Sequence, residues 1–160
     1  MKATLLIFAV VMVGCVSTPV IDYGSNNATA KAEIEKWIRK SANKSTGELS
    51  KADLEKVTEV HLAGSSQYQI TDVSPFVGLR QLKVLVLNHN KLTDVSALAG
   101  LKQLTHLHLF GAGIQDVSPL MGLSKLKILD LRHNPDLTKA QIAELQKALP
   151  KCNISHDAKK

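Results

Sequence analysis

Histidine is the residue type in this sequence with the clearest chemical potential. Two of the six histidines, His106 and His108, stand two residues apart, and Asp130 follows His108 by 22 residues. Neutral imidazoles together with a carboxylate are ordinary ligands of zinc or nickel. Imidazoles also titrate between about pH 5 and 8, so several of them on one surface would make binding sensitive to pH. A metal-handling patch and a pH-sensitive interface are therefore two hypotheses to examine.

Other candidate chemistry is explained by periodicity. Asp72, Asp94 and Asp116 could act as catalytic acids, but they recur every 22 residues and each is followed by Val-Ser. Such regularity is typical of turn-forming residues in repeats. The sequence lacks a phosphate-binding glycine loop, paired CxxC motifs, HExxH and GxSxG. We therefore expect no enzyme, no catalytic residues and no cofactor.

The same interval of 22 residues organises the apolar residues of the central chain. The form L-x-x-L-x-L recurs three times after a degenerate first copy, and Asn90 and Asn134 stand three residues after the last leucine of their copies. Residues 57–137 thereby resemble the leucine-rich-repeat consensus, specifically the 22-residue internalin type. The apolar positions are Val57, Val60 and Leu62, then Leu82, Leu85 and Leu87, then Leu104, Leu107 and Leu109, then Leu126, Leu129 and Leu131.

This resemblance implies an α/β fold, a right-handed leucine-rich-repeat solenoid with short parallel strands on its concave face. The spaced leucines would point inward and form one continuous core. The side chains of Asn90 and Asn134 would pair backbone groups that the bends leave unsatisfied. Ala112 takes the place of asparagine in the third repeat, so we expect that turn to lack the side-chain bonds and to be more mobile.

The ends of a solenoid expose its core and need caps. Residues 30–56 show helical spacing of apolar residues, which predicts a helical N-terminal cap in which Trp37 is a packing residue. Residues 138–160 are predicted to hold a C-terminal helix, a capping strand and a tail. Leu149, Cys152 and Ile154 repeat the spacing of Leu126, Leu129 and Leu131, and this match predicts that Cys152 points into the core.

Residues between the inward leucines would form the concave surface, and all six histidines fall in these columns. A mixture of apolar and polar side chains is typical of protein-binding surfaces. Neighbours on one strand face lie nearly 7 Å apart and strands about 4.8 Å apart, so a tetrahedral metal site is difficult to close there. We predict no metal site and a protein-binding face that comprises His61, Val84, Val86, Asn88, His106, His108, Phe110, Asp130 and Arg132.

The N-terminus has the features of a targeting segment. Residues 1–14 combine Lys2 with a short apolar run, as in secretory signal peptides. Met12-Val13-Gly14-Cys15 resembles the lipobox of bacterial lipoproteins, which implies that Cys15 is acylated and anchors the protein. An ordinary signal peptide cleaved near Ser17 is the alternative. Residues 15–29 would form a flexible tether. Val16 follows Cys15, and the resemblance to Gram-negative lipoproteins that lack Asp at this position implies the outer rather than the inner membrane.

Charge and composition limit the classes of partner that the protein is expected to bind. The net charge of +6 comes from basic residues that are dispersed along the chain, which indicates solubility and leaves a weak attraction to anionic surfaces open. Aromatic residues make up only 4%, too few for the stacking surfaces of single-strand binders, so we expect no nucleic acid partner. The sequence thus predicts a monomeric, membrane-anchored module that binds a protein and catalyses nothing. The alternatives are a structural envelope lipoprotein and a metal-handling histidine patch.

Overall fold

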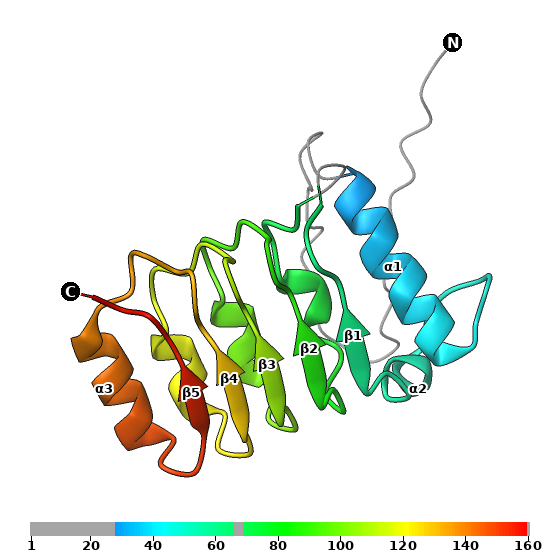
Figure 1. The fold of residues 1–160 in the computed structure, drawn as a ribbon. Coiled ribbons are helices and arrows are strands. Elements are labelled where there is room, and N and C mark those ends of the chain that lie inside the picture. Colours follow the sequence, from blue (N-terminus) through cyan, green and yellow to red (C-terminus); the bar gives the residue numbers. More distant parts are fainter. Residues whose placement is uncertain (1–27, 66–68, 160) are drawn as a thin grey trace.

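The computed structural model describes residues 28–65 and 69–159. Five short strands form one parallel sheet in the order β1-β2-β3-β4-β5, which is also their order in the sequence (Figure 1). The strands are β1 (Glu59–His61), β2 (Val84–Val86), β3 (His106–His108), β4 (Ile128–Asp130) and β5 (Asn153–Ser155). The architecture confirms the predicted α/β solenoid of stacked parallel strands.

The inward side chains of these strands form a continuous apolar core. The central residues of β1 to β4 are Val60, Leu85, Leu107 and Leu129, and each is 0% exposed. The next inward column, two residues further along, is buried as well. Burial of a leucine side chain contributes about 1.5–3 kcal/mol. Since each repeat contacts only its neighbours, the stack as a whole provides the burial that one repeat cannot.

On the other face, short 3-10 helices carry the chain back to the start of the next strand. They are η2 (Ser74–Phe76), η3 (Ser96–Gly100) and η4 (Ser118–Gly122). The carboxylate of Asp72 accepts a hydrogen bond from the backbone N–H of Ser74 at 2.8 Å, and Asp94 and Asp116 repeat this bond with the serine two residues on. These aspartates are turn formers, as their period predicts.

Buried asparagines join the repeats at the rim where the strands end. The side-chain amide of Asn134 donates to the carbonyl oxygens of Leu109 and Leu131, both at 2.9 Å. Its oxygen accepts from the backbone N–H of Ile114 at 2.9 Å. Asn90 makes the equivalent bonds to the first repeat. The two asparagines are 1% and 3% exposed, so these bonds satisfy backbone groups that water does not reach.

In the third turn, a backbone group rather than an asparagine side chain makes the hydrogen bond between repeats. The N–H of Leu92 donates to the carbonyl oxygen of Ala112 at 2.7 Å, in place of an asparagine side chain. This geometry needs left-handed backbone on both sides, with φ of +57° at Gly111 and +77° at Gly113. Ala112 is fully buried. The side-chain bonds are absent, as expected, but a main-chain bond between repeats takes their place.

Helices close both ends of the stack. At the N-terminal end, α1 (Ala28–Ala42) contacts β1, and α2 (Lys51–Leu54) begins with a capping box between Ser50 and Asp53. Because α1 begins at Ala28, the last two residues of the predicted tether are helical. At the other end, α3 (Lys139–Ala148) begins with a second capping box and contacts η4. The predicted signal peptide, Cys15 and the rest of the tether lie outside the described residues.

The predicted register of the last strand was wrong. Leu129 pairs with Ile154 and Asp130 with Ser155, whereas the sequence match placed Cys152 beside Leu129. Cys152 is nevertheless buried, and burial raises the pKa of its thiol. The outward residues of β5 are therefore shifted by two positions, and Asn153 rather than Lys151 lies beside Ile128.

Substitution of Gly113 tests the backbone solution of the third turn. An added Cβ would find no heavy atom closer than 4.0 Å, so Gly113→Ala should act only through its φ of +77°. We expect a loss of about 1–2 kcal/mol in the free energy of unfolding, measured by urea denaturation. Gly100→Ala is the control, because its Cβ also enters open space and its backbone is not left-handed. Equal effects of the two substitutions would contradict this account.

Candidate functional site

The strand register brings most of the predicted binding residues together on the concave face. His61, Val86, His108 and Asp130 form one lateral row across β1 to β4. Val84 and His106 lie in the row beside it, between Glu59 and Ile128. The side chains are exposed or half-buried except for Asp130, which is buried. The parallel stacking of the repeats thus places these residues as the sequence predicts.

An aromatic cluster lies where β3 and its neighbours end. The ring of Phe110 stacks on His133 with centroids 4.4 Å apart and meets the edge of His89 at 5.0 Å. The guanidinium of Arg132 lies 5.5 Å from the centre of the Phe110 ring. Gly111 separates the two histidines, since a Cβ there would approach both. Phe110 is half-buried, so the cluster presents a fixed ring with polar groups around it.

Left-handed backbone explains how the two histidines reach this ring. His89 and His133 have φ of 56° and 60°, and each directly precedes a buried asparagine of the turns. A non-glycine residue in this conformation is uncommon, and histidine is among the types enriched there. The asparagine turns therefore fix the direction of both imidazoles. Phe110 and Arg132 were predicted as binding residues. His89 and His133 were predicted to lie on the concave surface with the other histidines, but their contact with Phe110 was not predicted.

Arg132 also holds the carboxylate of Asp130. The Nε of Arg132 donates to one carboxylate oxygen at 2.9 Å, and a terminal nitrogen donates to the other at 2.7 Å. These bonds lower the pKa of Asp130 below its usual range. His108 is the register neighbour of Asp130, yet both carboxylate oxygens bond to the arginine. His108 and Asp130 are thus adjacent, as predicted. The carboxylate of Asp130 forms an ion pair with Arg132, however, rather than a metal-ligand set with His108.

The remaining predicted residues differ in role. Asn88 accepts a hydrogen bond from the backbone N–H of Phe110 at 3.0 Å, so it joins two repeats in addition to lining the surface. The Nδ1 of His106 lies 2.9 Å from the hydroxyl of Thr105. In the part of the chain that the structure describes, no group of three or more His, Cys, Asp or Glu residues is placed to hold a metal ion.

The N-terminal cap extends the concave surface. Trp37 of α1 stacks on His61 of β1, with ring centroids 5.8 Å apart and an angle of 26° between the planes. The amine of Lys40 lies 5.5 Å from the centre of the indole. Trp37 is half-buried against the core, so it packs as predicted and also presents an aromatic face. Sequence spacing gave no signal for this contact, because Trp37 and His61 belong to different elements.

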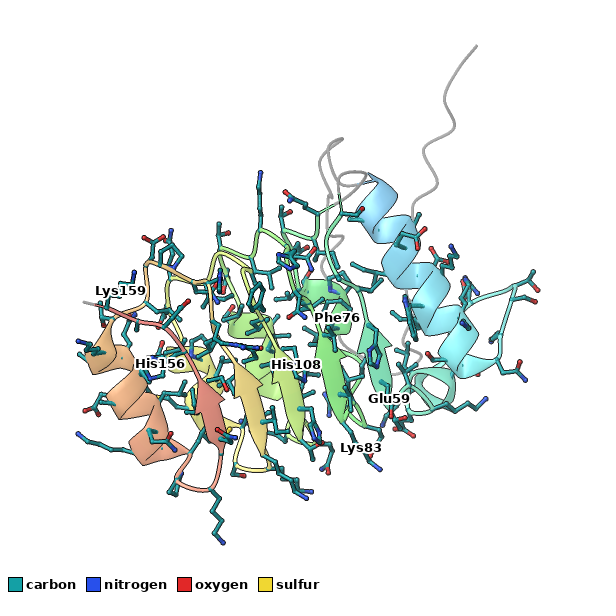
Figure 2. All side chains as sticks on the ribbon, viewed as in Figure 1. Glu59, Phe76, Lys83, His108, His156 and Lys159 are labelled. Carbon is teal, nitrogen blue, oxygen red and sulfur yellow. The ribbon has the colours of Figure 1, made fainter. Side chains whose placement is uncertain are left out.

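His156 does not join the other histidines in the way the sequence match predicted. The shifted register of β5 carries Asp157 to the turn of β4, where its carboxylate accepts from the backbone N–H of His133 at 3.0 Å. His156 is exposed beyond the end of β5, and Figure 2 shows it apart from His108. The histidine patch therefore comprises residues of the repeats and excludes His156.

Stacked parallel strands, inward leucine columns and asparagine turns together define a leucine-rich-repeat solenoid. Residues 55–114 match the leucine rich repeat family. The solved structures of internalins from Listeria monocytogenes are similar over most of this chain. The chain thus contains leucine-rich repeats, and its fold is similar to that of internalins.

The similarity to these structures is substantial in coverage and modest in identity. An internalin (inlF) from Listeria monocytogenes is 27% identical with a TM-score of 0.62, and the match covers 81% of this chain and 44% of that one. An internalin C2 (inlC2) from the same species is 26% identical with a TM-score of 0.56, covering 80% and 66%. A leucine-rich-repeat protein of Leptospira interrogans is 26% identical with a TM-score of 0.56, covering 64% and 26%. The chain thus spans less than two thirds of each of these proteins.

No curated protein matches the chain. None of the helices in the described part has the length and apolar character needed to cross a lipid bilayer.

The ion pair of Asp130 predicts a specific pH dependence. Its folded-state pKa is lowered, so the stabilisation is present above the unfolded pKa of about 3.9 and is lost as the pH falls through the folded value. Asp130→Asn should therefore lower the free energy of unfolding at pH 7, and the difference from the wild type should shrink below about pH 4. Urea denaturation at a series of pH values measures this difference.

Arg132→Gln provides the partner variant for this measurement. At pH 7 it should reproduce most of the loss of Asp130→Asn, and the double variant should lose little more than either single variant, because all three lack the same ion pair. Additive losses at pH 7, or an Asp130→Asn difference that does not change with pH, would contradict this role of the pair.

Proposed function

We propose that this protein is a non-catalytic protein-binding module that uses its concave face and is anchored to the membrane of a bacterial envelope. The aromatic cluster around Phe110 is the observation that carries the binding proposal. Aromatic and arginine side chains are enriched among the residues that dominate binding energy at protein interfaces. Here a half-buried phenylalanine is held between two imidazoles and beneath a guanidinium.

The surface around the cluster supports the same proposal. Ile128 of β4 is 38% exposed, and the half-buried Val84 and Val86 add apolar area on β2. Histidines and an ion pair lie among them, so the face combines apolar and polar groups as protein interfaces do. The side chains stand on short strands of a stacked sheet, which lowers the ordering cost of binding. A spacer with no partner would not need this combination.

The anchoring part of the proposal depends on Met12-Val13-Gly14-Cys15. Acyl chains contribute about 0.8 kcal/mol of membrane affinity per buried methylene, so more than one chain on Cys15 anchors a protein without any membrane-spanning helix. Anchoring would leave the concave face of the solenoid available to partners at the membrane surface.

Alanine substitutions separate a binding face from a structural spacer. The partner would first be identified by cross-linking of the full chain in its own cells. Phe110→Ala and His108→Ala should then weaken binding, by about 30-fold for Phe110 if it acts as a dominant contact. The thermal midpoint should stay close to that of the wild type, since neither side chain is fully buried. Calorimetry and thermal unfolding measure the two effects.

Two variants outside the face serve as matched controls. Val77→Ala removes an apolar side chain that is 50% exposed next to η2 on the opposite face, and His156→Ala removes an exposed histidine beyond β5. Both should retain full affinity. If Phe110→Ala and His108→Ala bind as well as the controls do, the concave face is not the binding surface and a structural role is favoured.

Substitution of Cys15 tests the anchor. Cys15→Ser should move the protein from the membrane to the soluble fraction of lysed cells and should abolish the diacylglyceryl mass on the N-terminal peptide. Mass spectrometry of the wild-type N-terminus is the companion measurement. A wild-type protein cleaved near Ser17 without any lipid would show that the segment is an ordinary signal peptide.

A further inference from the structure

Basic side chains gather along one rim of the solenoid, the rim where the strands begin. The basic residues are dispersed along the sequence, but the fold brings six of them together. Between residues 80 and 127 the only acidic residues are Asp94 and Asp116, and both lie in the turns after the strands. Six exposed cations form what we call the basic rim, namely Arg80, Lys83, Lys102, Lys125, Lys127 and Lys151.

Stacking explains why these residues meet. Arg80 and Lys102 occupy equivalent positions of successive repeats, and Lys83 and Lys127 are two repeats apart. Because strands lie about 4.8 Å apart in a sheet, residues spread over about 70 positions of the sequence line up across about 15 Å of one edge, from the start of β2 to the start of β5. Lys83 marks this rim at the lower edge of the sheet in Figure 2.

These cations are not neutralised within the protein. In residues 28–65 and 69–159, none of the six forms an ion pair with a carboxylate. Lys102 donates to the carbonyl oxygen of Gly122 at 3.1 Å, and Lys125 to the amide oxygen of Gln103 at 2.6 Å. Lys56 and Lys147, at the two ends of the rim, are instead paired with Asp53 and Glu144. Within the described residues, the six cations of the basic rim thus have no carboxylate partner, whereas the lysines at its two ends do.

The opposite rim carries most of the carboxylates of the repeats. The turns that follow the strands carry Asp72, Asp94 and Asp116, and Asp136 and Asp157 lie at the last turns. Hydrogen bonds from Ser96 and Ser118 lower the pKa of Asp94 and Asp116, so these two carboxylates stay ionised. This rim also carries the exposed Lys91 and Lys139, so its charges are mixed, whereas those of the basic rim are all positive. The molecule therefore has a preferred orientation on a charged surface.

We propose that the basic rim docks on the face of an anionic lipid bilayer. Five of the six cations are lysines, which act as hydrated point charges and suit delocalised attraction better than bidentate recognition of one phosphate. All six precede strands β2 to β5 and therefore lie along one edge of the solenoid. An edge lined with unpaired cations matches a planar surface of negative headgroups.

The composition of the rim argues against the main alternative, a single-stranded nucleic acid. None of the basic rim residues has an aromatic neighbour in its own strand-start segment, because residues 79–83, 101–105, 123–127 and 149–153 contain no Phe, Tyr or Trp. Single-strand binders stack bases on aromatic side chains. The aromatic residues of the concave face, Phe110 and Trp37, lie away from these segments.

Docking through the basic rim sets the orientation of the molecule. The strands would stand upright on the bilayer with their first residues toward the lipid, so the concave face would open sideways (Figure 1). Phe110 follows the end of β3, so the cluster around it would lie at the end farther from the lipid. α1 begins at Ala28 on the far rim, but the 12 residues between it and Cys15 reach at most about 45 Å. This exceeds the length of α1, about 22 Å, so the predicted anchor is compatible with docking. The proposal does not depend on the protein-binding function.

Vesicle binding of charge variants tests the docking. The full chain with Cys15→Ser would be compared on vesicles of phosphatidylglycerol and phosphatidylcholine and on vesicles of phosphatidylcholine alone, at low salt. The ratio of the two partition coefficients isolates the contribution of charge. Lys83→Gln, Lys127→Gln and Lys151→Gln together should lower this ratio by about 100-fold, from about fivefold per lysine. High salt should lower the wild-type ratio as well.

The matched control removes three charges from the opposite side. Lys91, Lys139 and Lys159 are exposed and follow strand ends or begin α3, so their replacement by glutamine changes net charge equally. The control should keep most of the wild-type ratio, and thermal unfolding should show that both triple variants are folded. Equal losses in the two variants would show that only net charge matters and would overturn the proposal. A rim variant that loses binding to a single-stranded oligonucleotide but keeps its vesicle ratio would overturn it too.

Discussion

Each strand of this protein is held by the repeat that follows it. The backbone N–H groups of Leu62, Leu87, Leu109 and Leu131 each donate to a carbonyl oxygen one strand further on, at 2.8–2.9 Å. The same leucines fill one of the inward columns, so hydrogen bonding and apolar burial fix a single register. A slip of one residue would turn every inward leucine outward. The register therefore also decides which side chains share the concave face and which share each rim.

Much of this could be predicted from the sequence, because the period of 22 residues is strict where the core needs it. Leu85, Leu107 and Leu129 recur at that interval and are buried as predicted. Because these leucines point inward, the residues on either side of them must face solvent. The positions of His61, His108 and Phe110 on the concave face could therefore be predicted. The last strand shows the limit of this reasoning. Leu149, Cys152 and Ile154 have the same spacing as Leu126, Leu129 and Leu131, yet it is Ile154 and not Cys152 that pairs with Leu129. The repeat before β5 contains α3 in place of the usual turn, so no turn residues indicated this register.

Features that depend on contacts between repeats were not visible in linear order. The carbonyl of Ala112 accepts from the N–H of Leu92 at a turn where Gly113 as well as Gly111 has left-handed backbone, and the residue type at position 112 does not indicate this bond. The stacking of Trp37 on His61 joins separate elements. Lysines that are dispersed along the sequence form the basic rim only because the repeats stack on one another. A comparison of charges at equivalent positions of the repeats would have revealed this rim from the sequence. On this account, one register produces a face suited to a protein and an edge suited to a bilayer.

Amide hydrogen exchange measures the shared register most directly. If the repeats form one stack, the N–H groups of Leu62, Leu87, Leu109 and Leu131 should exchange only when the whole solenoid unfolds. Their exchange free energies should then agree with one another and with the free energy of unfolding from urea denaturation. Exchange of these four amides at the rates of an unstructured peptide, or in repeats that open independently, would contradict the account.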